Sequence, residues 1–263
     1  MTSARHVALS LVAPLAAVGA AIVICPHIPV SLAVASAVTF LGAAIVSVLG
    51  VALGAHRMVS GRAVLLIDVG AIIGLSIIAV LRARHPLVAA LVDTLLIAFA
   101  WATGAAIGER VEDPAHLLPA AAVAAAADVA SVVSSWGPSA AIAGSERALA
   151  VLAISFPVPG THAVAPSLGV GDLIFIALAL GVARRHALPY LRITLLALFG
   201  VVLAGFASAA LERAVPALPA IGAMIVAFVP RARAVRRRDR SVTTIALGIS
   251  AVVVVLTIVG LRR

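Results

Sequence analysis

The stretch from residue 168 to residue 175 reads LGVGDLIF, and it places one carboxylate, Asp172, beside two glycines at the start of a long apolar run. An ionisable side chain at the centre of a membrane helix costs at least about 2.5–3.5 kcal/mol on insertion scales. Such residues therefore face a partner, a water-filled cavity or a functional site. We expect Asp172 to occupy a position of this kind.

The composition around this stretch is that of a multi-pass membrane protein. Of the 263 residues, 63% are hydrophobic and 11% are charged. Soluble domains carry about 25% charged residues, roughly twice as many. The mean hydropathy is +1.23. The one cysteine, Cys25, excludes an internal disulfide and any metal site that needs several cysteines.

Apolar runs of about 20 residues, the length that crosses a bilayer, recur along the whole chain. They predict an all-α, polytopic bundle of nine spans at 7–25, 30–54, 63–81, 86–108, 117–135, 168–183, 190–211, 214–230 and 242–260. The first run follows Arg5 but is long and leads directly into further spans, so we expect a retained helix rather than a signal peptide. One membrane domain, 1–263, accounts for the chain, with N-terminal helices in 1–110, a central group in 117–230 and a final span at 242–260.

The connection from 136 to 167 is the one long interruption in this pattern. It opens with Trp136-Gly137-Pro138 and is closed by prolines and a glycine between 157 and 160. Its middle, 141–156, is apolar but contains Glu146-Arg147. This pattern predicts a short helix that lies along the membrane interface and does not cross it.

The formal net charge of +9 would indicate nucleic-acid binding in a soluble protein. Here the positive charges are arginines in short loops between apolar runs, where they act as topology signals and contact lipid phosphates. With the N-terminus inside, thirteen arginines fall on the inner side and six on the outer side, and the dense run from Arg231 to Arg240 decides the orientation. We therefore expect no nucleic-acid partner and an integral protein of a prokaryotic cytoplasmic membrane.

Four of the ten acidic residues lie inside predicted spans: Asp68, Asp93, Asp128 and Asp172. Asp68 is close in sequence to Arg62, and Asp93 is close to Arg84 and His85. For these two acids an ion pair or a water-filled vestibule is a better explanation than direct catalysis.

Asp128 and Asp172 can meet at a similar depth in the membrane. At a rise of 1.5 Å per residue, Asp128 lies about 10 Å from the end of its helix at 135, and Asp172 about 6 Å from the start of its own at 168. If the connecting loop does not cross the membrane, both ends face the same side. If 141–156 does cross about 30 Å of hydrocarbon, the two depths differ by about 14 Å.

Two carboxylates in a low-dielectric site suit aspartyl proteolysis. One, ionised, takes a proton from water while the other, protonated, donates to the peptide carbonyl oxygen, and repulsion between like charges makes the pair share one proton. A transporter can use the same pair as a proton relay. Spacing alone does not separate these two functions.

The residues around the acids favour the protease. Gly169-Val170-Gly171-Asp172 resembles the G-x-G-D motif of the presenilin and signal peptide peptidase family, and Pro216-Ala217-Leu218-Pro219 resembles its PAL motif. Asp128 also fits, because Gly137-Pro138 follow nine and ten residues later. The order of these elements matches the family over the C-terminal half of the chain. The first 110 residues match it only as a set of apolar helices.

The resemblance implies an intramembrane aspartyl endopeptidase with a presenilin-like fold, in which 117–230 holds the catalytic helices. It implies Asp128 and Asp172 as the catalytic dyad and no metal or organic cofactor. It further implies transmembrane peptides as substrates, which pair with the enzyme as strands near the PAL motif. With the N-terminus inside, these substrates are expected to resemble type II membrane segments or signal-peptide remnants. The chain departs from the family pattern in having Ala127, not tyrosine, before Asp128.

The glycines and prolines of these motifs have two readings each. Gly169 and Gly171 allow a substrate backbone to approach Asp172 closely, or they allow two helices to pack closely. The prolines in the segment Pro216 to Pro219 start a helix, where proline is common, or they keep an irregular backbone that lines a wet cavity and holds an unwound substrate.

Other classes of function find less support in the sequence. The seven histidines are scattered singly among loops, and the H-E-x-x-H pattern of helical zinc proteases is absent. Two alternatives stay open: an ion- or proton-coupled transporter or channel that uses the intramembrane acids, and an inactive presenilin-like protein that binds membrane helices.

Overall fold

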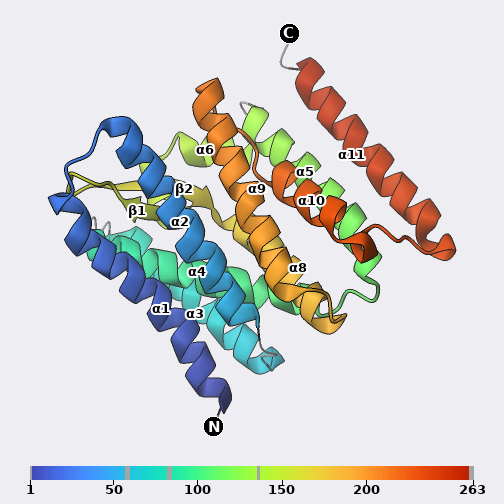
Figure 1. Ribbon diagram of the computed structural model, residues 1–263, viewed down its shortest axis with the longest axis horizontal. Coiled ribbons are helices and arrows are strands. Elements are labelled where there is room, and N and C mark those ends of the chain that lie inside the picture. Colours follow the sequence, from blue (N-terminus) through green and yellow to red (C-terminus); the bar gives the residue numbers. More distant parts are fainter. Residues whose placement is uncertain (1, 57–59, 82–84, 135–136, 261–263) are drawn as a thin grey trace. The chain divides into compact units, whose positions relative to one another are not determined.

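The computed structural model describes residues 2–56, 60–81, 85–134 and 137–260, with the side chains of 8–56, 60–81, 85–134 and 137–259. The predictions for Arg84 and Trp136 lie outside these residues. Within them the chain forms eleven α-helices joined by short turns and one pair of strands (Figure 1).

Eight of the α-helices are long, with 16 to 24 residues each. The N-terminal group comprises α1 Thr2–Ile24, α2 Leu32–Ala55, α3 Gly61–Leu81 and α4 Pro86–Gly108, and the later long helices are α5 Leu117–Val133, α8 Val170–Arg185, α9 Tyr190–Leu211 and α11 Arg240–Gly260. Three short helices and the strands complete the fold: α6 Pro138–Ala143, α7 Glu146–Leu152, α10 Leu218–Phe228, β1 Ala153–Pro157 and β2 Val164–Gly169.

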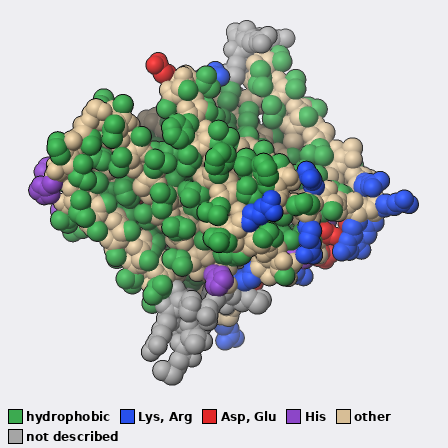
Figure 2. Space-filling view, viewed as in Figure 1, with side chains coloured by type: hydrophobic (Ala, Val, Ile, Leu, Met, Phe, Trp, Pro, Cys, Tyr) green, Lys and Arg blue, Asp and Glu red, His purple; other side chains and the backbone are tan. Residues whose placement is uncertain are grey.

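Seven segments in the described residues are long and apolar enough to cross a membrane, with mean hydropathies from 1.6 to 2.7: Ala8–His27, Leu32–Ala55, Gly61–Leu81, Pro86–Gly108, Pro114–Val133, Tyr190–Leu211 and Arg237–Val259. Large apolar side chains cover their outer faces, as much of the surface in Figure 2 shows. In α3 only Ala71 is buried. Such surfaces are stable against lipid, and the chain is a multi-pass membrane protein.

Two of the nine predicted spans are shorter than the rest. The segment expected at 168–183 forms α8, with 16 residues, and that expected at 214–230 forms α10, with 11 residues. At 1.5 Å per residue these helices are about 24 Å and about 17 Å long, below the thickness of the hydrocarbon core, about 30 Å. The helical architecture is confirmed, with seven segments of the described residues long and apolar enough to cross a membrane, and the nine spans and the presenilin-like fold stay predictions.

The chain forms two compact units, each of which we describe by itself. Unit 1 comprises Met1–Gly108 and Glu146–Gly181, and unit 2 comprises Glu109–Ser145 and Val182–Arg263. The single domain over 1–263 stays a prediction.

Helix α4 forms the centre of unit 1. It packs against α1, α2, α3 and β1, and it buries Leu96, Ile97 and Trp101 almost completely. Gly104 brings it close to α8, since a Cβ at this position would lie 2.6 Å from the Cβ of Ala177. Of its buried polar side chains, Thr94 donates to the carbonyl oxygen of Ala90 in the same helix, whereas Asp93 takes its partner from β1.

The strands β1 and β2 form an antiparallel hairpin where the sequence predicts an interfacial helix over 141–156. Only the first part of that segment is helical, as α6 and α7. The rest becomes a strand because Ile154, Ser155 and Phe156 are better suited to a strand than to a helix and Pro157 cannot continue a helix. No helix long enough to cross a membrane lies in the described part of this connection, from 137 to 169.

Unit 2 is built around α10. This helix packs against α5 and α9, and α11 packs against α5. Two glycines allow the close contacts: a Cβ on Gly222 would lie 3.0 Å from that of Ala121, and a Cβ on Gly200 would lie 2.7 Å from the Cα of Ile221. These are helix–helix contacts through small residues, as is common within membranes.

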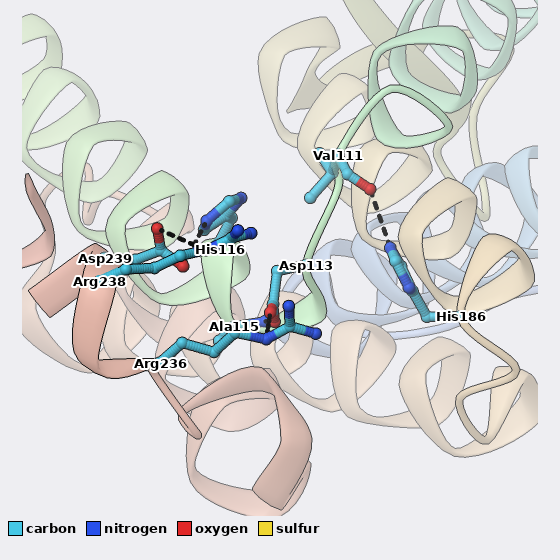
Figure 3. A network of polar contacts seen from close by, with 8 residues as sticks. All are labelled: Val111, Asp113, Ala115, His116, His186, Arg236, Arg238 and Asp239. Carbon is cyan, nitrogen blue, oxygen red and sulfur yellow. Dashed lines mark hydrogen bonds and ion pairs between the residues drawn. The ribbon is translucent and has the colours of Figure 1, made fainter.

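Polar residues connect the start of α5 to the arginine-rich segment before α11 (Figure 3). Nε of Arg236 lies 2.5 Å from Oδ2 of Asp113, and Nε2 of His116 lies 3.7 Å from Oδ2 of Asp239. Oδ1 of Asp113 also accepts the main-chain N–H of Ala115 at 2.9 Å. These contacts hold the arginine-rich segment of unit 2 against the beginning of α5.

Candidate active site

Asp128 lies in α5 and reaches the beginning of another helix. Its Oδ2 accepts the main-chain N–H of Leu218 at 2.9 Å, and its side chain is half-buried. The first N–H groups of a helix have no partner within it. A Ser, Thr, Asp or Asn before the helix usually accepts one of them, but here the preceding residue is Ala217, which has no acceptor. Asp128 supplies the missing acceptor from α5.

The four PAL residues form the entry to α10. Pro216 is outside the helix, Ala217 is the N-cap residue, and Leu218 and Pro219 are the first two helical residues. Because Pro219 has no N–H, Leu218 provides the N–H donor of this pair. The prolines thus act at a helix start, and they leave a non-helical segment before it. The sequence placed Asp128 and this motif in one site, and the structure brings them together.

Asp172 lies where β2 passes into α8. Gly169 is the last residue of β2, and Asp172 is in the first turn of α8. The positive end of a helix dipole favours an acid at this position. The side chain is half-buried. The sequence predicts a helix that begins at 168. The structure corrects this prediction, because β2 continues to Gly169 and α8 begins at Val170.

The two glycines before Asp172 are not required for packing within unit 1. A Cβ on Gly171 would meet no atom of the unit within 4 Å, and a Cβ on Gly169 would meet only Oδ2 of Asp172, at an ordinary contact distance of 3.5 Å. Neither glycine has a positive φ. Close helix packing therefore explains Gly104 but not these two residues, which leave open space beside the carboxylate.

Asp172 belongs to unit 1 and Asp128 to unit 2. The structure therefore describes two half-sites, one formed by β2, two glycines and Asp172, the other by Asp128 and the PAL residues. Their combination into a dyad stays a prediction.

The other two acids within predicted spans have partners that the sequence did not suggest. Asp68 accepts a hydrogen bond from the side chain of Thr103, and no ion pair joins it to Arg62 in the described residues. Asp93 is 1% exposed, and its Oδ1 accepts the main-chain N–H of Ser155 at 2.8 Å. No signal in the sequence connects Asp93 to a residue 62 positions away.

A cavity of about 510 Å³ lies in unit 1 beside the hairpin. Its walls come from α3, α4, α7 and both strands, and they include Ile78, Val88, Val92, Ser155 and Val164. The size falls within the range of ligand sites, about 300–1,000 Å³. The hairpin that leads to Asp172 therefore borders open space on one side. In the described residues, no three or more His, Cys, Asp or Glu side chains come together as a metal site.

No protein-family model, curated protein or solved structure matches the chain. The motifs around Asp128, Asp172 and Leu218 therefore carry the functional argument by themselves.

Proposed function

We propose that the chain is an intramembrane aspartyl endopeptidase that hydrolyses peptide bonds within transmembrane segments. One observation carries the proposal: Asp128 and Leu218, which belong to two separate motifs of the sequence, are joined by a hydrogen bond in the folded chain.

The chemistry requires two carboxylates and a water molecule. Asp128 and Asp172 share one proton; the ionised carboxylate takes a proton from water, and the protonated one donates to the carbonyl oxygen of the scissile bond. The hydroxide equivalent attacks the carbonyl carbon, and collapse of the tetrahedral intermediate breaks the C–N bond as the amine takes up a proton. No metal or organic cofactor enters these steps.

The substrate must be extended before its peptide bonds are accessible, since a transmembrane helix hides them. Strand β2 supports this requirement: among the described residues the sheet has the order β1-β2, and no further strand pairs with the other edge of β2. An exposed strand edge offers N–H and C=O groups to an extended peptide. This edge leads directly to Gly169 and Asp172, and the space beside Gly171 admits a peptide backbone.

A transition-state-mimicking inhibitor of aspartyl proteases distinguishes this function from transport. The purified protein is titrated with the inhibitor, and in parallel it is reconstituted in proteoliposomes to measure ion and proton flux. We expect saturable binding of the inhibitor, lost in Asp128→Ala and Asp172→Ala, and no flux. Flux that depends on Asp68 or Asp93, without inhibitor binding, would instead show a transporter. Absence of both cleavage and flux, with binding of transmembrane peptides, would show an inactive helix-binding protein.

A further inference from the structure

Asp93 is the most deeply buried acid of unit 1, and one hydrogen bond joins it to another element of the fold. It is 1% exposed within α4. Its Oδ1 accepts the N–H of Ser155 at 2.8 Å, while Oδ2 has no hydrogen-bond partner in the described residues. Burying a carboxyl group with an incomplete set of partners is unfavourable. A serine or alanine at this position of α4 would avoid the penalty. We therefore ask what the hydrogen bond from Ser155 to Asp93 contributes to the fold.

Ser155 lies where the register of the hairpin changes. Toward the turn of the hairpin, Ser155 pairs with Pro166. Toward α8, Ile154 pairs with Leu168. Strand β2 thus has one extra residue, Ser167, between two consecutive residues of β1. This is a β-bulge, and Asp93 binds the main chain of β1 directly at the bulge.

A second side chain holds β1 near its other end. Oγ1 of Thr39 lies 3.2 Å from the carbonyl oxygen of Pro157 and 2.8 Å from that of Ala35 in its own helix, so its one hydroxyl hydrogen is shared between the two acceptors. Helices α2 and α4 therefore fix β1 at two points, Pro157 and Ser155, and β2 takes its position from β1.

The register of β2 decides where Asp172 lies. A slip by one residue moves a strand by about 3.4 Å and turns every side chain to the other face. Gly169 pairs with Ala153, and Asp172 follows three residues later in the first turn of α8. Loss of the bulge would therefore displace the start of α8 and the carboxylate.

We propose that Asp93 is a positioning residue: its hydrogen bond to Ser155 holds the bulged register of β1 and β2 and so sets the position of Asp172 against the substrate strand. The expected effect of Asp93 on cleavage rests on the proposed protease function. Its effect on the register of the strands does not depend on that function. Asp93 touches neither the substrate nor the reacting atoms.

Disulfide crosslinking measures the register without reference to activity. On a Cys25→Ser background, the pair Ile154→Cys and Leu168→Cys reports the bulged register, and the pair Ile154→Cys and Ser167→Cys reports the slipped one. With Asp93 present, the first pair should crosslink several-fold more than the second. Asp93→Ala should reverse this preference. Asp93→Asn, which keeps an oxygen acceptor, should restore it.

Cleavage products provide the second readout. Mass spectrometry of a transmembrane peptide cut by Asp93→Ala should show ends displaced by one or more residues, whereas Asp93→Asn should return the cut to the wild-type position. A residue that only stabilises the fold would lower the yield without moving the cut. If Asp93→Ala does not accumulate, Asp93→Leu keeps the volume while removing the acceptor and is measured in the same way.

The outcomes separate the two proposals. If the wild-type protein cuts no peptide but the crosslinks respond to Asp93→Ala, the protease function fails and the register role stands. If Asp93→Ala leaves both the crosslinks and the cut position unchanged, the inference is overturned. A preference for the slipped pair with Asp93 present also overturns it, because the bulge is then not the native register.

Discussion

Oδ2 of Asp128 lies 2.9 Å from the main-chain nitrogen of Leu218, although 90 residues separate the two in the chain. A carboxylate at this point satisfies one of the free N–H groups of α10 and meets the positive end of its dipole. The contact gives the PAL residues a physical role: Leu218 and Ala217 present main-chain N–H groups to the acid, and Pro219 presents none. Asp128 is consequently held in place by the motif that follows it in the sequence.

The contact predicts different effects for two replacements of Asp128. Asp128→Asn keeps a carbonyl oxygen that can accept from Leu218, so thermal unfolding in detergent should stay close to wild type. Asp128→Ala removes the acceptor and should lower the free energy of unfolding by about 1 kcal/mol, as the loss of a helix cap does. Equal stability of the two variants, or a lower stability of Asp128→Asn, would contradict the role of the hydrogen bond.

The open space beside Asp172 predicts that a larger residue at position 171 lowers activity without lowering stability. Gly171→Ala adds a methyl group that meets no atom of unit 1 within 4 Å. It should leave stability unchanged or raise it by up to about 1 kcal/mol, because alanine is the better helix former. Cleavage of a transmembrane peptide should fall by roughly 10- to 100-fold, because the methyl group occupies space meant for the substrate backbone.

Gly104→Ala is the matched control. A Cβ there would lie 2.6 Å from that of Ala177, so the change should lower stability by about 1–3 kcal/mol through overpacking. If Gly171→Ala cleaves at the wild-type rate, the open space has no part in substrate binding.

The pH dependence of stability should reveal Asp113, which precedes α5. The N–H of Ala115 holds the pKa of the Asp113 carboxyl below its usual range, and Arg236 lowers the pKa further, against the opposing effect of burial. A carboxyl group whose pKa is lower in the folded chain stabilises the fold above its unfolded pKa, about 3.9. That stabilisation is lost as the pH falls through the folded value.

Thermal unfolding of wild type and Asp113→Asn should therefore differ most at neutral pH and converge as the pH falls below about 4. Arg236→Gln serves as the comparison. Its side chain is 60% exposed, so loss of this ion pair should cost no more than about 1 kcal/mol. A difference between wild type and Asp113→Asn that stays constant from pH 7 to pH 3 would contradict this account.

The sequence predicts long helices well when a proline marks the beginning of the helix. The spans predicted at 86–108 and 190–211 are α4 and α9 with the same bounds, because Pro86 begins the first, Pro189 precedes the second, and a long, mainly apolar run follows each proline. The span predicted at 214–230 begins later, at Leu218. Pro216 and Pro219 interrupt hydrogen bonding there, so hydropathy alone placed the beginning too early.

The hairpin was missed for a different reason. A short apolar run such as 153–157 has no period that separates a strand from a buried helix, and its strand character depends on its partner strand at 164–169. The same holds for the site. The motifs identify Asp128, Asp172 and the PAL residues, but the bonds of Asp128 to Leu218 and of Asp93 to Ser155 arise from tertiary packing, for which no local pattern exists.

Cleavage of a transmembrane peptide by the purified protein decides whether the chain is an aspartyl protease. Wild type, Asp128→Asn and Asp172→Asn are each reconstituted with the peptide in proteoliposomes, and the products are identified by mass spectrometry. The account predicts cuts within the transmembrane segment by wild type and a loss of at least about 100-fold in each variant, the contribution expected of an acid–base group. Full activity in either variant, with its fold intact, would contradict it.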